Sequence, residues 1–82
     1  MKRRKTPPPE LDIHGLREEE AQRKIAAFLD GLDDGVCEVV IIHGYRGGQV
    51  LRDMVRTQLR HPRIVSVLPA LNEGTTRIIL SV

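Results

Sequence analysis

The stretch VVIIHGYRGGQVLRDMV, from Val39 to Val55, changes character twice and decides the fold. It opens with four β-branched residues in a run without strict alternation, which is typical of a central strand with both faces at least partly covered. A glycine-rich loop follows, and apolar residues then recur at helical spacing. Some proteins hold a phosphate where a strand leads through a glycine-rich loop into a helix, although most such loops only join two elements. The stretch therefore predicts a strand, a loop and a helix, and it makes the loop the first candidate for a binding site.

A shorter strand and a longer helix precede this stretch. In LDIHG, apolar Leu11 and Ile13 alternate with polar Asp12 and His14, which predicts a strand with one covered face and one polar face. The helix that follows has three glutamates in its first turn, where the helix dipole favours them, and it ends near Gly35. Its apolar face is formed by Ala21, Ile25, Phe28, Leu29 and Leu32.

The second half of the chain completes the predicted topology. Apolar spacing extends the second helix to His61, where Pro62 ends it. Residues 64–68 and 76–80 are predicted strands, joined by a turn at residues 72–74. The order βαβαββ predicts an α/β fold, a two-layer sandwich in which two helices cover one face of a mixed four-stranded sheet. Residues 14–15 and 43–48 would then meet at the carboxyl edge of the sheet, where open α/β sheets bind ligands.

Length and composition place the chain among ordinary globular domains. It has 82 residues, of which 40% are apolar and 29% are charged, and this length suffices for one domain. We assign residues 10–82 to that domain and residues 1–9, which are basic and proline-rich, to a flexible tail. No apolar run approaches the ~18 residues of a membrane span, so we expect a cytoplasmic protein with no membrane partner. Cys37 is expected to be reduced and buried, and the oligomeric state is left open.

Charge is distributed unevenly along the chain. Segment 17–38 has seven acidic and three basic residues, whereas segment 46–63 has five arginines and one acidic residue. Three arginines recur every four residues on the second helix and predict a positive stripe: Arg52, Arg56 and Arg60. Such a stripe is more often a solvated face, but acidic neighbours are scarce, and Arg46 and Arg63 extend the stripe to a basic patch of five arginines. This favours contact with phosphates. Because aromatic residues are scarce, we expect recognition of a nucleic-acid backbone or shape rather than of bases.

Three motifs in this order, LDIHG, IIHGYRGGQVLRDMV and NEGTTRIIL, resemble the Smr (small MutS-related) domain over nearly all of residues 11–82. The resemblance implies the same βαβαββ sandwich, which is similar to the C-terminal domain of a bacterial translation initiation factor. Members of this family are associated with nicking or cleaving DNA or RNA, and some of them act at stalled ribosomes. The family therefore implies nucleic acid, either RNA or structured DNA, as a partner, and the ribosome as a further one.

Two groups of site residues are expected at the strand ends. Asp12, His14 and His43 would supply general acid–base chemistry near neutral pH or three ligands for a divalent metal. The alternative is that they only end strands or cap loops. The second group would hold a phosphate through backbone amides and guanidinium groups and comprises Gly44, Arg46, Gly47, Gly48, Arg52 and Arg56. The alternative here is a tight connection in which the glycines supply positive φ angles.

Two functions from different classes follow from these residues. The first is an endonuclease, a hydrolase that cleaves or nicks RNA or structured DNA with Asp12 and His14 near the scissile phosphate. The second is a non-catalytic module that binds nucleic acid or the ribosome through the same surface. The second motif reads HGYRGG where the family more commonly has HGxGxG, and it is one residue longer before its leucine. This departure favours the second function if it displaces the phosphate from Asp12 and His14.

Overall fold

The computed structural model describes residues 7–44 and 49–81 and contains the elements in the predicted order. The strands are β1 (Glu10–Asp12), β2 (Glu38–Ile42), β3 (Ile64–Pro69) and β4 (Thr75–Leu80). The helices are α1 (Glu18–Asp30), α2 (Gln49–Asp53) and η1 (Met54–Gln58), a π-helical segment that continues α2. The predicted phosphate-binding residues Arg46, Gly47 and Gly48 lie outside the described residues.

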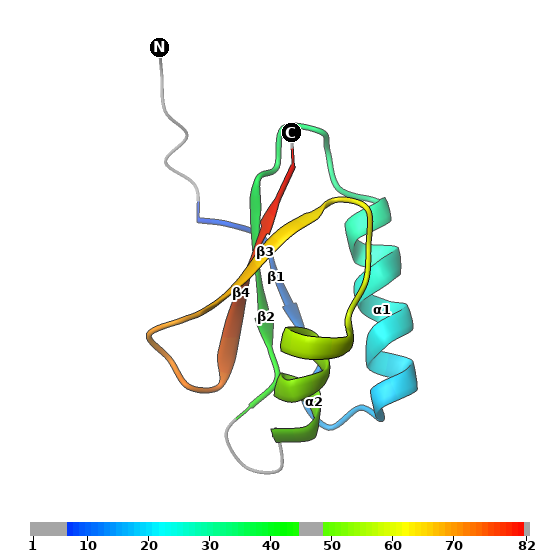
Figure 1. Cartoon of the computed structure of the whole chain (residues 1–82), viewed down its shortest axis with the longest axis vertical. Helices are drawn as coiled ribbons and strands as arrows, with labels where there is room; N and C mark the ends of the chain where they lie inside the picture. The colour runs from blue at the N-terminus through cyan, green and yellow to red at the C-terminus, as the bar shows by residue number, and fades with distance from the viewer. Residues whose placement is uncertain (1–6, 45–48, 82) are drawn as a thin grey trace.

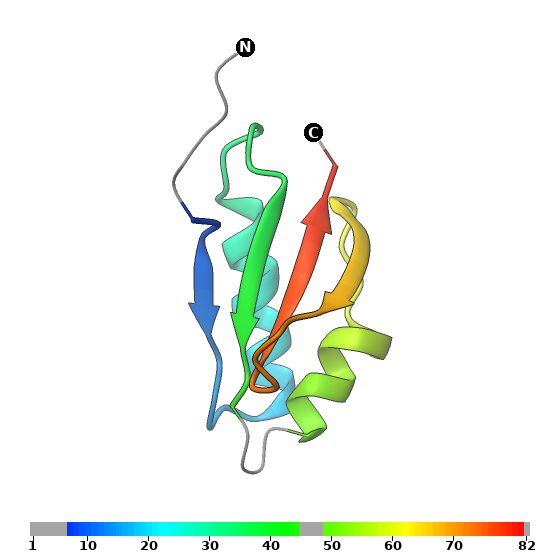
Figure 2. The same cartoon turned by 90° about the vertical axis from the view of Figure 1, so that its left-hand side faces the viewer.

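The four strands form one mixed sheet in the order β1-β2-β4-β3. β1 pairs parallel with β2, and β4 lies antiparallel between β2 and β3. Figure 2 shows this order across the sheet, with β1 and β2 ending at the same edge. Both helical segments lie on one side of the sheet (Figure 1). The predicted α/β two-layer sandwich is therefore confirmed.

The core lies between the helices and one face of the sheet. Val39, Ile41 and Ile78 point from the central strands into it and are 0% exposed, and apolar residues of both helical segments pack against them. Val40 and Ile42 on the opposite face of β2 are half-buried. This burial pattern agrees with the prediction that both faces of β2 are at least partly covered.

Three local predictions are wrong. The first helix ends at Asp30, with Gly31 as its C-cap, rather than near Gly35. Cys37 is exposed because it lies just before β2, outside the part of the sheet that the helices cover. The second helix ends at Gln58 rather than near His61. The N–H of Leu59 donates to the carbonyl of Met54, five residues earlier, at 2.9 Å, and this wider π-type turn places Leu59 in the core. Within the described ranges, no helix is both long enough and apolar enough to cross a membrane.

Candidate functional site

Three chain segments meet at the edge of the sheet where β1 and β2 end and β4 begins. Gly44 follows β2 with a φ of +88°, and a Cβ built on it would lie 3.4 Å from the Cβ of His14. A Cβ on Gly74 would lie 3.3 Å from the carbonyl carbon of Gly44. The N–H groups of His43 and Gly44 both donate to the carbonyl of Gly74 at 2.9 Å. The two glycines therefore permit a close approach of backbone that larger residues would hinder.

Asp12 and His14 form an exposed acid–histidine pair at the end of β1. Oδ1 of Asp12 lies 2.5 Å from Nδ1 of His14 and accepts the backbone N–H of His14 at 3.0 Å. The side-chain hydrogen bond from His14, followed by the backbone one, lowers the pKa of Asp12, so this carboxylate is ionised at neutral pH. Because Nδ1 faces the carboxylate, the neutral ring has its lone pair on Nε2. The side chain of His14 is 69% exposed, so this ring is accessible to a ligand.

His43 lies at the same edge but is buried, with 2% of its surface exposed. Nε2 lies 2.8 Å from Oγ1 of Thr76, and Nδ1 lies 3.3 Å from the carbonyl oxygen of Gly44. Burial is the main cause that lowers the pKa of His43, and the charges of Arg56 and Arg52 act in the same direction. The ring is therefore neutral at pH 7, and both of its nitrogens contact protein atoms. This environment suits a positioning role; the expected acid–base role of His43 stays a prediction.

The divalent-metal alternative required Asp12, His14 and His43 to act as three ligands. In residues 7–44 and 49–81, no group of three or more His, Cys, Asp or Glu side chains is arranged to hold a metal ion. Asp12 and His14 contact each other, whereas both nitrogens of His43 are occupied by Thr76 and Gly44. A metal at this edge would therefore need ligands beyond these three residues.

Arg56 joins the edge from η1. Its Nε donates to Oγ1 of Thr76 at 3.3 Å, and the residue is exposed. Arg52 on α2 is half-buried, with its Nε 3.5 Å from Oδ1 of its neighbour Asp53. Both guanidinium groups thus carry positive charge beside the buried ring of His43. We refer to Asp12, His14, His43, Gly44, Arg56, Gly74 and Thr76 as the strand-end cluster.

Two arginines of the predicted basic patch donate to backbone carbonyls. Arg60 follows η1 and donates from one terminal nitrogen to the carbonyls of Thr57 and Leu59. Arg63 directly precedes β3. The start of β3 and the end of α1 lie at the other end of the strands (Figure 2). Its two terminal nitrogens donate at 3.1 to 3.2 Å to the carbonyls of Leu29, Leu32, Asp33 and Val36. Both terminal nitrogens of Arg63 are thus engaged within the fold, and we call Arg63 with its four carbonyl partners the Arg63 clamp. Phosphate contact by the exposed Arg60 stays a prediction.

Thr76 and Gly74 were missed as site residues, although both belong to the motif NEGTTRIIL. Thr76 alternates with Ile78 and Leu80 on the face of β4 that points into the core. A polar residue on an otherwise apolar strand face needs a buried hydrogen-bond partner. That signal marks Thr76 as a residue with a partner, but the sequence does not say that the partners are His43 and Arg56.

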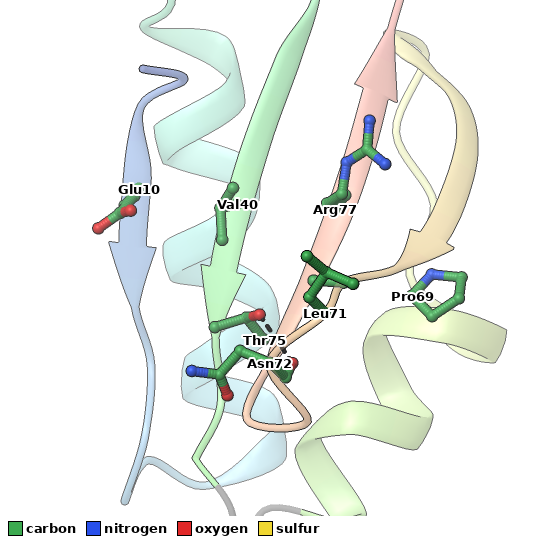
Figure 3. A pocket seen from close by; sticks show the side chains of 8 residues that line it. Glu10, Val40, Pro69, Leu71, Asn72, Thr75 and Arg77 are labelled. Atoms are coloured by element: carbon green, nitrogen blue, oxygen red, sulfur yellow. Dashed lines mark hydrogen bonds between the residues drawn. The ribbon is translucent and has the colours of Figure 1, made fainter.

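A shallow depression on the open face of the sheet offers different chemistry (Figure 3). It is lined by Glu10, Val40, Pro69, Ala70, Leu71, Asn72, Thr75 and Arg77. Nε of Arg77 donates to Oε2 of Glu38 at 2.8 Å, so a carboxylate already compensates the positive charge of this surface. Glu10 adds a second negative charge. A polyanion is therefore better matched by the strand-end cluster, with Arg56 and the nearby Arg52, than by this depression.

Comparison with known proteins identifies the motifs at this edge. The model of the Smr domain family matches residues 11–76. Endonuclease MutS2 of Halalkalibacterium halodurans is 45% identical over 69 residues, which cover 80% of this chain and 9% of that protein. Endonuclease MutS2 of Symbiobacterium thermophilum is 45% identical over 58 residues, covering 70% of this chain and 7% of that protein. Endonuclease MutS2 of Shouchella clausii is 36% identical over 67 residues, covering 79% of this chain and 8% of that protein. The chain thus spans less than a tenth of the length of these relatives.

Proposed function

Because the chain belongs to the Smr domain family, we propose that it is a nucleic-acid-binding domain that acts as an endonuclease on RNA or structured DNA. The observation that carries this proposal is the exposed Asp12–His14 pair, which packs against Gly44 in the strand-end cluster. The name of the relatives, endonuclease MutS2, supports cleavage of a nucleic-acid backbone.

The residues of the cluster have separate tasks in this reaction. Arg56 and Arg52 attract the phosphate backbone, and their charges make binding independent of base sequence. Nε2 of His14 takes the proton from the attacking water or sugar hydroxyl as the new bond to phosphorus forms. The P–O bond to the leaving sugar oxygen breaks, and that oxygen takes up a proton from water or from the imidazolium. Asp12, which is ionised, holds the ring through Nδ1 and stabilises the imidazolium that results. The predicted loop residues Arg46, Gly47 and Gly48 would add amide and guanidinium donors to the same phosphate.

The second candidate function is binding without cleavage, with structured nucleic acid or ribosomal RNA as the partner. One observation favours it. His43 is buried with both ring nitrogens engaged, so the exposed acid–base groups at the cluster reduce to the Asp12–His14 pair. The altered loop HGYRGG would add to this if its extra residue displaces the phosphate from Asp12 and His14.

Incubation of the purified chain with labelled single-stranded, double-stranded and branched RNA and DNA, with and without a chelator, separates the two functions. If the chain is an endonuclease, Asp12→Asn and His14→Ala should each lower the cleavage rate by about 10²-fold or more while binding persists. Asp30→Asn is a matched control, because Asp30 also pairs with a histidine, His61, at 2.8 Å but lies at the end of α1. It should cleave at the wild-type rate.

Each result has a distinct meaning. Full-rate cleavage by both the Asp12 and the His14 variants would show that other residues or a contaminating nuclease are responsible. Binding by the wild-type chain without cleavage of any probe would replace the endonuclease with the binding module. A wild-type chain that binds none of the probes would refute both candidate functions.

A further inference from the structure

A buried hydroxyl group connects the two halves of the strand-end cluster. Thr76 is 0% exposed. Its Oγ1 lies 2.8 Å from Nε2 of His43, at the end of β2, and accepts the Nε–H of Arg56, on η1, at 3.3 Å. One side chain of β4 thus contacts a buried ring on one side and an exposed cation on the other.

The direction of this hydrogen-bond chain follows from the carbonyl of Gly44, which selects the tautomer of His43. The Nε–H of Arg56 can only donate, so Oγ1 of Thr76 accepts there and its own hydrogen is available to Nε2 of His43. The carbonyl of Gly44 can only accept, so Nδ1 of His43 carries the ring proton. The chain therefore runs from Arg56 through Thr76 and His43 to Gly44. Every member is satisfied when the ring is neutral.

We propose that Thr76 is a positioning residue, which holds the guanidinium of Arg56 at the strand ends and links it through His43 to the peptide of Gly44. The inference rests on the proposed function and adds a means of preorganisation to it. A guanidinium that is already held in place loses less conformational freedom when it binds a phosphate. The same chain fixes the carbonyl of Gly44, the last described residue before loop 45–48.

Two variants of the 82-residue chain separate the hydroxyl group from the shape of the side chain. Thr76→Val keeps the branching at Cβ but removes the hydroxyl, whereas Thr76→Ser keeps the hydroxyl. In nitrogen-15 NMR spectra without nucleic acid, Thr76→Ser should retain the wild-type Nδ1–H tautomer of His43 and a protected Arg56 Nε–H. Thr76→Val should lose that protection and change the ring signals. A wild-type ring that is protonated on Nε2, or unchanged signals in Thr76→Val, would overturn the proposal.

Affinity for a labelled single-stranded RNA and a labelled branched DNA tests the consequence for binding. Thr76→Val should bind about two- to tenfold more weakly, which is the value of one hydrogen bond. Adding Thr76→Val to Arg56→Ala should cause no further loss, because both changes remove the same interaction. Wild-type affinity in Thr76→Val, or additive losses, would overturn this inference and leave the proposed function intact. A wild-type chain that binds neither probe would overturn both.

Arg56→Lys is the second variant, to be used if Thr76→Val does not fold. It keeps the positive charge and lacks the Nε–H donor that Thr76 accepts. If Thr76 positions the arginine, Arg56→Lys should also bind about two- to tenfold more weakly than wild type, even though the net charge is the same. Wild-type affinity in Arg56→Lys would show that charge alone suffices and would overturn the proposal.

Discussion

The two ends of the strands use arginine in opposite ways. At one end, Arg63 donates from both terminal nitrogens to four backbone carbonyls around the end of α1. At the other end, Arg56 is exposed and donates from Nε to the hydroxyl of Thr76. The sequence predicts a single phosphate-contacting patch that includes both. The difference shows that an arginine whose terminal nitrogens bind free helix carbonyls, as in Arg63, stabilises the fold. An arginine that is held through Nε, as in Arg56, keeps its terminal nitrogens as donors for a ligand.

The largest expected effect is a loss of stability when the Arg63 clamp is removed. Arg63→Ala should lower the free energy of unfolding by about 2 to 4 kcal/mol, because partly buried carbonyls of the α1 end lose a charged donor. Urea denaturation measures this change. Arg23→Ala, which removes an exposed arginine from α1, should stay within about 0.5 kcal/mol of wild type. Wild-type stability in Arg63→Ala together with weaker nucleic-acid binding would show that Arg63 contacts the ligand and does not stabilise the fold.

A smaller effect is expected from the backbone at the strand-end cluster. Gly44→Ala should cost about 1 to 3 kcal/mol, because Gly44 has a φ of +88° and its new Cβ would lie in close contact, at 3.4 Å, with the Cβ of His14. Gly15→Ala meets the same conformational strain at φ +80°, but nothing lies within 4 Å of its Cβ, so its cost should be lower. Gly35→Ala has neither problem and should be neutral within about 0.5 kcal/mol. Equal costs at Gly44 and Gly15 would show that the close packing against His14 is unimportant.

The buried ring of His43 predicts a dependence of stability on pH. Its pKa is lowered in the folded chain from the ordinary value of 6.5, chiefly by burial. As the pH falls below about 6.5, His43 is therefore protonated in the unfolded chain before it is protonated in the folded chain. The free energy of unfolding then falls by at most about 1.4 kcal/mol per pH unit until the folded ring titrates. Above that pH, this contribution is fully present. His43→Gln should give a shallower fall between about pH 7 and 5 in unfolding experiments; equal slopes would contradict a depressed pKa.

Local signals in the sequence predicted the order of the elements and much of the candidate site. The alternation in LDIHG and the helical spacing after Gly48 depend on residues close together in the chain. Parallel neighbouring strands end at the same edge of a sheet, and this rule predicted that Asp12, His14, His43 and Gly44 lie close together. The structure places all four at that edge. Their roles in binding and cleavage stay predictions.

The remaining features arise from contacts between distant segments. The carbonyl partners of Arg63 lie 27 to 34 residues earlier, so nothing near Arg63 in the sequence marks it as part of the fold. The wide turn of η1 follows from the burial of Met54, Val55 and Leu59 together, which helical spacing alone does not require. Thr76 contacts His43, which lies 33 residues earlier in the chain. A sequence shows that such groups need partners but not which partners they find.

The salt dependence of nucleic-acid binding by Arg56→Ala is the most direct test of the central claim that the strand-end cluster contacts the phosphate backbone. Fluorescence anisotropy with a labelled single-stranded RNA and a branched DNA, at several salt concentrations, compares this variant with wild type and with Arg23→Ala, which removes the same charge from α1. We predict that Arg56→Ala reduces the slope of log K against log salt by about one unit, with similar losses for all base sequences, and that Arg23→Ala leaves the slope unchanged. An unchanged slope in Arg56→Ala, or an equal decrease in Arg23→Ala, would contradict phosphate binding at the cluster.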